Sequence, residues 1–155
     1  FETYEFGFFR QIRIGQYGKR FYVFKIRTMR DVTSRDVITV AGDKRITFFG
    51  KIFRKYKIDE LPQLINIFLG QMSVVGPRPD VPGYADRLRN LDRQILLLKP
   101  GITGPASLKY RHEEELLSKQ LDPNLFNDSV IWPDKVRLNL QYLTNWTLSK
   151  DLSYI

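Results

Sequence analysis

A chain of 155 residues, 43% of them hydrophobic, is long enough for one globular domain with a buried core. It has no cysteine and one histidine, His112, which excludes disulfides and thiolate metal sites and argues against zinc, so that any metal ion should be a hard cation bound by oxygen. The net charge of +8 favours polyanionic partners, whether nucleic acid, an anionic membrane surface or a phosphorylated small molecule.

The sequence contains no run of about 20 apolar residues, so no segment is predicted to cross a bilayer. It also has no signal peptide with an apolar stretch followed by a small-residue cleavage site. We therefore expect this length of chain to be soluble or peripheral.

Two β-rich runs near the start predict a β-hairpin, Phe8 to Ile14 and Phe21 to Arg27. Between them lie two glycines that can adopt positive φ, as tight turns require. In the second run Tyr22, Phe24 and Ile26 alternate with Phe21, Val23 and Lys25, so one face can pack, while Lys25 and Arg27 mark where the strand turns polar. The polar segment from Asp31 to Asp43 has no period and predicts a loop.

Two helical patterns follow, and the first begins after Thr47, a plausible N-cap. We expect its apolar side to pack in the core rather than to face a membrane; this side comprises Phe48, Phe49, Ile52, Phe53 and Tyr56.

The second pattern begins at Asp59, a candidate N-cap, tolerates Pro62 in its first turn and ends at Gly70. Its apolar positions are Leu61, Leu64, Ile65 and Phe68.

The remainder of the chain predicts a helix from Tyr84 to Leu98, one or two helical turns from Glu113 to Gln120, and a last helix from Pro133 to Trp146. Asp122 to Ser129 is expected to be a loop, and the tail from Leu148 to Ile155 to dock on the body. These expectations describe an α+β fold: a mainly helical single domain over residues 1–155 with an N-terminal β-hairpin.

The adjacent carboxylates Asp59 and Glu60 have cations on both sides: Arg54 and Lys57 precede them, and Arg78 follows in a loop braced by two prolines. One interpretation is structural, with the aspartate capping a helix and the glutamate complementing its dipole. The other is a site for phosphate chemistry, because nearby cations keep a carboxylate ionised and can hold a phosphoryl group against it.

A carboxylate that attacks phosphorus forms an acyl phosphate, which divides one displacement into two steps. Helix N-terminal amides and a divalent cation would offset the repulsion between the anionic nucleophile and an anionic substrate. Glu60 is then a natural ligand for Mg²⁺, which prefers carboxylates together with substrate phosphates and water.

Five ordered motifs, covering nearly the whole chain from Phe9 onward, resemble the bacterial sugar transferase family, the monotopic phosphoglycosyl transferases. They are Lys25-Ile-Arg-Thr-Met29, Asp43-Lys-Arg-Ile-Thr47, Ile58-Asp-Glu-Leu-Pro-Gln-Leu64, Met72-Ser-Val-Val-Gly-Pro-Arg-Pro79 and Pro100-Gly-Ile-Thr-Gly104.

The resemblance implies transfer of a sugar-1-phosphate from a UDP-sugar to a polyprenyl phosphate such as undecaprenyl phosphate, with release of UMP, at the cytoplasmic face of the bacterial inner membrane. Asp59 matches the family nucleophile and Glu60 its partner, and both are implied ligands of Mg²⁺. The arginines implied in substrate binding are Arg54, Arg78 and Arg111, and Lys25 and Arg27 match a basic strand with a weaker claim to that role.

The chain departs from the family pattern at Gln71 and at Asn139, where the family usually carries aspartate, and at Ser107 to Tyr110, which replace a glutamine-valine-asparagine-glycine run. Members also have a re-entrant membrane helix just ahead of this region, and we expect the apolar opening from Phe1 to Phe9 to lie where such an anchor joins. These departures keep a catalytically weak relative, serving in assembly of a glycan-synthesis complex, as an alternative. A basic nucleic-acid-binding domain is another, although no reading module is apparent.

Overall fold

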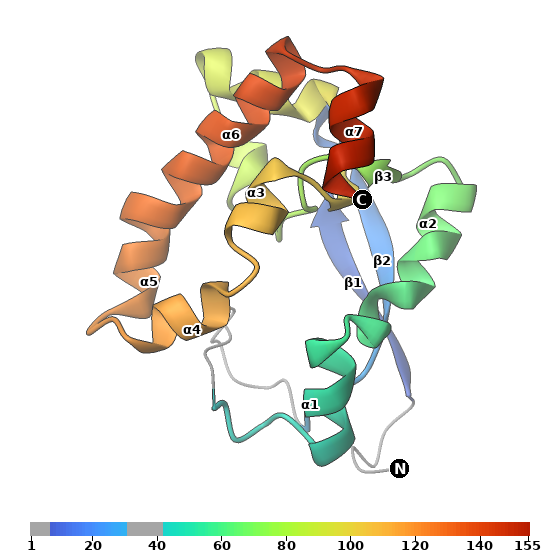
Figure 1. Cartoon of the computed structure of the whole chain (residues 1–155), viewed down its shortest axis with the longest axis vertical. Coiled ribbons are helices and arrows are strands. Elements are labelled where there is room, and N and C mark those ends of the chain that lie inside the picture. The colour runs from blue at the N-terminus through green and yellow to red at the C-terminus, as the bar shows by residue number, and fades with distance from the viewer. Residues whose placement is uncertain (1–6, 31–41) are drawn as a thin grey trace.

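In the computed structural model, which describes residues 7–30 and 42–155, the chain begins with the predicted hairpin (Figure 1). β1 (Phe8–Ile14) pairs antiparallel with β2 (Arg20–Ile26), with Phe9 opposite Lys25. The turn η1 (Gln16–Gly18) contains two residues with positive φ, Tyr17 at 60° and Gly18 at 76°. Two predicted segments lie largely outside the described residues: the loop from Asp31 to Asp43, of which positions 31–41 are not described, and the apolar opening, of which positions 1–6 are not described.

Helix α1 (Phe48–Lys55) begins as predicted, because the Thr47 side chain accepts a hydrogen bond of 2.9 Å from the Gly50 amide. The helix ends at a corner where Lys57 adopts left-handed backbone angles, φ 57° and ψ 23°.

After this corner come the 3-10 helix η2 (Ile58–Gln63) and α2 (Leu64–Phe68), and Gly70 ends the run with a φ of 71°. The prediction of Asp59 as N-cap is therefore wrong, since Lys57 occupies the cap position and Asp59 lies in the first turn.

The expectation that the aromatic side of α1 is core is also wrong. Phe48, Phe49 and Tyr56 are exposed, and the one buried residue of the helix is Gly50. A Cβ atom on Gly50 would lie 2.2 Å from the Thr28 carbonyl oxygen, so α1 approaches the chain through its glycine. Docking on this side turns the aromatic side outward.

A short parallel pair that the sequence did not predict joins β3 (Ser73–Val75) to β4 (Gly101–Thr103). The backbones meet so closely that a Cβ atom on Gly101 would lie 2.2 Å from the Gly76 nitrogen. Glycine is therefore required where the two strands touch.

The connection between these strands contains the 3-10 helices η3 (Ala85–Arg87) and η4 (Asn90–Leu97), and not the predicted continuous helix. Leu88 and Arg89 have extended backbone angles and Asn90 has a φ of 52°, which divides the segment.

The C-terminal part consists of helices. They are α3 (Pro105–Lys109), α4 (Glu113–Ser118), α5 (Pro123–Phe126), the π-helical turn η5 (Asn127–Ile131), α6 (Trp132–Thr144) and α7 (Leu148–Tyr154). The loop predicted from Asp122 to Ser129 is wrong, because Asp122 caps α5 by accepting a hydrogen bond of 3.0 Å from the Leu125 amide. The tail docks as predicted, with the Tyr142 hydroxyl donating to Asp151 at 2.7 Å.

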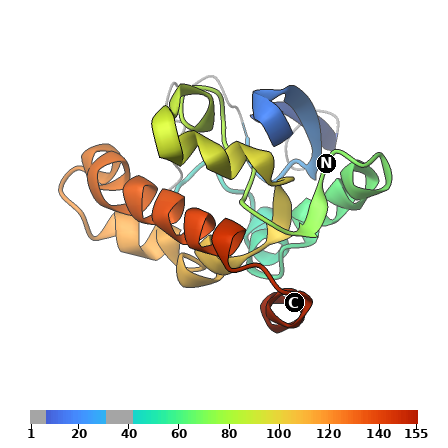
Figure 2. The same ribbon diagram turned by 90° about the horizontal axis from the view of Figure 1, so that it is seen from above.

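The main cluster of buried apolar residues joins the tip of the hairpin, the η3–η4 connection and α6. It comprises Ile14, Ala85, Ile95, Leu96 and Val136, with Leu88, Trp132 and Leu140 packed against it. Seen from above, η4 and α6 lie on one side, and the hairpin and α2 on the other (Figure 2). The predicted α+β class, mainly helical with an N-terminal hairpin, is confirmed. Within the described part of the chain, no helix combines the length and apolarity needed to cross a membrane.

Candidate active site

The acidic pair lies in the first turn of η2, and both carboxylates are buried. The left-handed corner at Lys57 turns the chain from α1 into η2, and the Glu60 amide donates to the Lys57 carbonyl at 3.2 Å. η2 packs against β2, so the acidic pair faces the strand that carries Lys25.

Glu60 is held by two cations. Both terminal nitrogens of Arg78 donate to its carboxylate, Nη1 to Oε2 at 3.1 Å and Nη2 to Oε1, and Lys25 Nζ lies 3.5 Å from Oε1. Burial by itself raises the pKa of Glu60, but the charges of Arg78 and Lys25 outweigh burial and hold that pKa well below its usual range. Glu60 is therefore ionised and electrically compensated at neutral pH.

Asp59 has a different environment. Its Oδ1 atom is buried and has no hydrogen-bond partner in the described part of the chain. Burial, followed by repulsion from Glu60, raises the pKa of Asp59 above its ordinary value, although Lys25, Arg54 and Lys57 oppose that shift. A desolvated carboxylate oxygen without a donor is a stronger nucleophile and ligand than a solvated one.

The position of Arg78 is fixed by hydrogen bonds to the backbone carbonyls of its two proline neighbours. The Gly101 amide donates to the Pro77 carbonyl at 2.8 Å, and the Arg13 side chain to the Pro79 carbonyl at 3.3 Å. Arg78 still has 42% of its side chain exposed, so it can meet a ligand while it holds Glu60.

Arg13 is a residue of the site that the sequence did not suggest. It lines a cavity of about 10 Å³ with Lys25 and Arg78, which is room for about one water molecule and too small for a phosphate. A substrate must therefore approach from the open side of Arg78.

Asn66 positions the segment that carries the acidic pair, and the sequence did not predict this role either. Its side chain is fully buried: Nδ2 donates to the Tyr22 carbonyl and to Gln71 Oε1, both at 2.7 Å, and Oδ1 accepts from the Phe24 amide at 3.3 Å. The amide thus pairs with the outer edge of β2 as another strand would, and fixes α2 beside Lys25.

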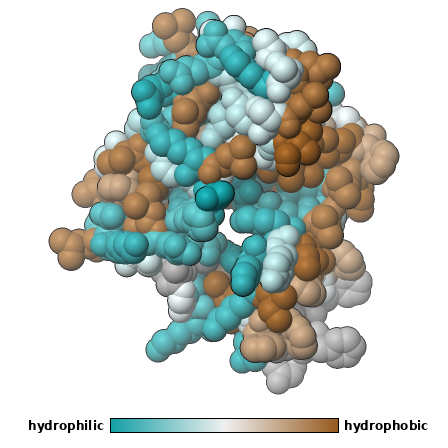
Figure 3. All heavy atoms as spheres, viewed as in Figure 1, coloured by the Kyte–Doolittle hydropathy of each residue, from teal (hydrophilic) through white to brown (hydrophobic). Residues whose placement is uncertain are grey.

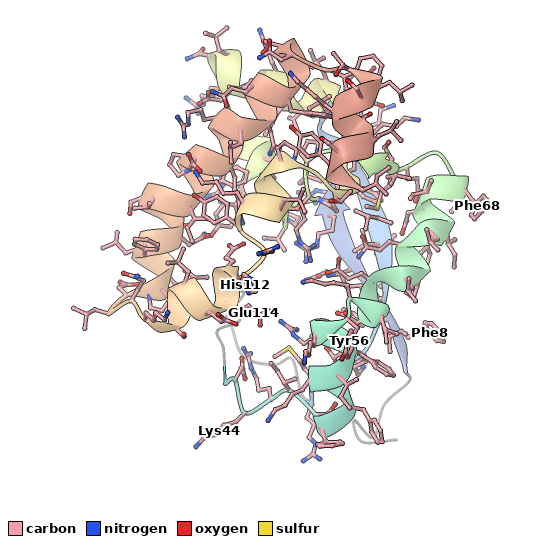
Figure 4. All side chains as sticks on the ribbon, viewed as in Figure 1. Phe8, Lys44, Tyr56, Phe68, His112 and Glu114 are labelled. Carbon is pink, nitrogen blue, oxygen red and sulfur yellow. The ribbon has the colours of Figure 1, made fainter. Side chains whose placement is uncertain are left out.

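A hollow with hydrophilic surroundings opens in the face shown in Figure 3. Arg54 on α1 reaches α4 on the other side, where it forms an ion pair with Glu114, which is labelled in Figure 4. Arg54 is also close enough to Asp59 for its charge to lower the pKa of that carboxyl.

The other two predicted site residues are Arg27 on the segment after β2 and Arg111 after α3. Arg27 stacks on the Phe9 ring at 5.4 Å, and Arg111 is exposed between α3 and α4. The family departures Ser107 and Asn139 lie on α3 and α6, which pack together, and each has a buried side-chain oxygen with no partner among the described residues. A larger cavity of about 280 Å³ between η4 and α6 contains none of the predicted site residues.

The acidic pair can accommodate a hard cation. Within residues 7–30 and 42–155 no three acidic or histidine side chains gather as a ready metal cage, so the protein would supply two carboxylates and the substrate the remaining ligands. Asp59 Oδ1 has no hydrogen-bond partner among those residues. A carboxylate has about four acceptor sites, so Glu60 can accept two hydrogen bonds from Arg78, pair with Lys25 and still offer a lone pair.

Sequence comparison identifies the family. The profile described as "Bacterial sugar transferase" matches residues 2–155. The chain belongs to the bacterial sugar transferase family. The resemblance inferred from the five motifs is therefore confirmed.

Curated relatives include the uncharacterized sugar transferase EpsL of Bacillus subtilis, 34% identical over 96% of this chain and 65% of that protein. A UDP-glucose:undecaprenyl-phosphate glucose-1-phosphate transferase of Klebsiella pneumoniae is 36% identical over 95% of this chain and 30% of its own length. An undecaprenyl-phosphate galactose phosphotransferase of Salmonella typhimurium is 32% identical over 92% and 30%. The chain thus spans less than two thirds of these relatives.

Proposed function

We propose that this chain is the catalytic part of a phosphoglycosyl transferase, which moves a sugar-1-phosphate from a UDP-sugar to undecaprenyl phosphate. The observation that carries the proposal is the contrast within the acidic pair. Asp59 has a buried oxygen with no partner in the described part of the chain, whereas Glu60 is neutralised by Arg78 and Lys25. The named activities of the Klebsiella and Salmonella relatives support the substrate classes. Because those two names specify glucose and galactose, the sugar is left open.

In the first step, a carboxylate oxygen of Asp59 attacks the phosphorus that bears the sugar. The bond from that phosphorus to the bridging oxygen breaks, and UMP leaves with the electron pair. In the second step, a phosphate oxygen of the lipid attacks the same phosphorus, the bond to Asp59 breaks, and the carboxylate is restored. No proton transfer to Asp59 is required in either step.

The surrounding cations offset the charge that accumulates on the phosphates. Arg54, Arg78 and Arg111 are the proposed phosphate contacts, and Lys25 holds Glu60 in place, while Arg27 is a weaker candidate. A Mg²⁺ ion held by Glu60 and Asp59 would neutralise phosphate oxygens when bound.

Apolar side chains gather on the side of the molecule that carries α1 and α2 (Figure 3), the helices on either side of η2 and its acidic pair. This apolar surface is formed by exposed residues of the hairpin, α1, η2 and α2: Phe8, Tyr56, Leu61, Leu64, Ile65 and Phe68. Phe68 is 91% exposed. We place this apolar surface against the cytoplasmic leaflet of the inner membrane, where the lipid acceptor resides and where anionic headgroups attract a basic chain.

Intact-mass spectrometry tests the nucleophile. Incubation with Mg²⁺ and the correct UDP-sugar should release UMP and add one sugar-phosphoryl group to the wild-type chain, but none to Asp59→Asn. Asp92→Asn, a change at an exposed position on η4, is the matched control and should form the adduct normally.

An adduct on Asp59→Asn would exclude Asp59 as the nucleophile. Salt-sensitive DNA binding without UMP release from any UDP-sugar would favour the nucleic-acid alternative instead.

A further inference from the structure

Three consecutive glutamates begin α4, and each has a different partner. Glu113 accepts from Lys135 Nζ at 2.7 and 2.8 Å, and Glu115 lies 3.7 Å from the ring of its own helix neighbour His112. Glu114 alone of the three pairs with a residue of α1, Arg54, 60 positions earlier in the chain. The pair joins two elements that lie on different sides of the gap in Figure 4.

Arg54 lies in the last turn of α1, which packs against η2, and its carbonyl accepts a hydrogen bond of 3.3 Å from the amide of Lys57, two residues before Asp59. Its Nη1 atom lies 3.7 Å from Met29 Sδ, which is a weak acceptor, and its Nη2 atom donates to Glu114 Oε1. Carboxylate and phosphate bind a guanidinium through the same planar pair of N–H donors. Glu114 therefore occupies an Arg54 donor, Nη2, that a substrate phosphate would use.

The exposures of the two side chains indicate that this pair can exchange. Glu114 is 44% exposed and Arg54 22% exposed, so water reaches the carboxylate. Exposed ion pairs contribute little, and the upper end of their range corresponds to about a fivefold change in a binding constant. A phosphate with more than one negative charge can displace such a partner.

We propose that Glu114 is an internal placeholder for the donor phosphate on Arg54, and that donor binding displaces it. The inference rests on the proposed function, from which it takes the nucleotide diphosphate as ligand. Displacement also releases the link between α1 and α4 when the donor enters. Glu114 is thus a residue that lowers donor affinity in the wild-type protein.

Calorimetric titration with UDP tests this proposal, in Mg²⁺ and separately in EDTA. Glu114→Gln should bind UDP roughly twofold to fivefold more tightly than the wild type in both buffers. Glu114→Asp retains the charge but is one methylene shorter, so it should also bind more tightly. Glu115→Gln removes the same charge from the next residue and should bind as the wild type does.

The proposal is overturned if Glu114→Gln binds UDP no more tightly than Glu115→Gln, or if the gain appears only with Mg²⁺. A gain in Glu114→Gln without one in Glu114→Asp overturns it as well, because charge alone would then explain the effect. If the wild type and every variant fail to bind UDP, the proposed function itself is contradicted, and this inference with it.

Discussion

Replacing Asn66 with leucine should destabilise the fold strongly, because the Asn66 amide forms hydrogen bonds with two backbone groups on the edge of β2 that β1 does not cover. Leucine has the same branched arrangement of side-chain heavy atoms and is somewhat larger, but it can neither donate nor accept a hydrogen bond. The Tyr22 carbonyl and the Phe24 amide, which Asn66 binds at 2.7 and 3.3 Å, would lose their partner. Asn66 is fully buried, so water cannot replace it without movement of α2.

The size of the effect follows from these two backbone groups. A buried polar group left without a partner costs about 1–3 kcal/mol, and the longer of the two bonds is weak, so a total of about 3 kcal/mol is expected. For a chain of this size, 1 kcal/mol lowers Tm by about 2–4 °C. The variant should therefore melt roughly 6–12 °C below the wild type.

Urea unfolding and thermal circular dichroism measure the difference. Asn124→Leu, at an exposed position in α5, is the matched control and should change the free energy of unfolding by less than about 0.5 kcal/mol. A loss below about 1 kcal/mol for Asn66→Leu at an unchanged m-value would refute the role assigned to its side chain.

Three further outcomes are expected. Burial and, after it, the charge of Arg78 lower the pKa of Lys25 to about 8, so the ammonium next to Glu60 loses its proton above that pH and the rate of sugar-phosphate transfer should decline there. In Lys25→Arg the rate should persist to higher pH. A pH–rate profile whose decline at high pH is the same in the wild type and in Lys25→Arg would contradict this. Gly101→Ala places a Cβ atom 2.2 Å from the Gly76 nitrogen, so it should lower the free energy of unfolding in urea by about 2 kcal/mol. A urea midpoint equal to that of the wild type would show that the two strands can move apart at no cost. Phe68→Ser should leave Tm within a few degrees, but it should weaken binding to vesicles with anionic lipid by about tenfold or more in a flotation assay. Equal flotation of the variant and the wild type would show that Phe68 does not contact the membrane.

The parts of the fold that the sequence predicted correctly depend on local chemistry. The hairpin follows from strand alternation and paired glycines, and α1 from the Thr47 cap. The helix expected from Tyr84 to Leu98 failed because leucine spacing of three and four cannot reveal extended angles at Leu88 or the positive φ of Asn90. Periodicity shows which residues could share a face, but not whether the backbone stays helical.

The site was predictable only in part. Asp59 and Glu60 were recognisable as adjacent carboxylates among cations, and Arg78 as a cation in a stiff loop. Arg13 and Asn66 were not, because their hydrogen-bond partners lie 66 and 44 positions away in the chain. Those contacts exist only after the hairpin has packed against α2 and the loop that carries Arg78, so no local pattern indicates them.

The left-handed corner before the acidic pair implies a trade-off between stability and activity. Lys57 has a φ of 57°, a conformation that costs a residue with a side chain about 1 kcal/mol and that glycine adopts freely. Yet its charge lowers the pKa of both Asp59 and Glu60, which glycine could not do. A form with glycine at this position would be relieved of the left-handed strain and would lose a cation where phosphate is handled. Selection for stability alone would therefore tend to remove this lysine, and selection for turnover to retain it.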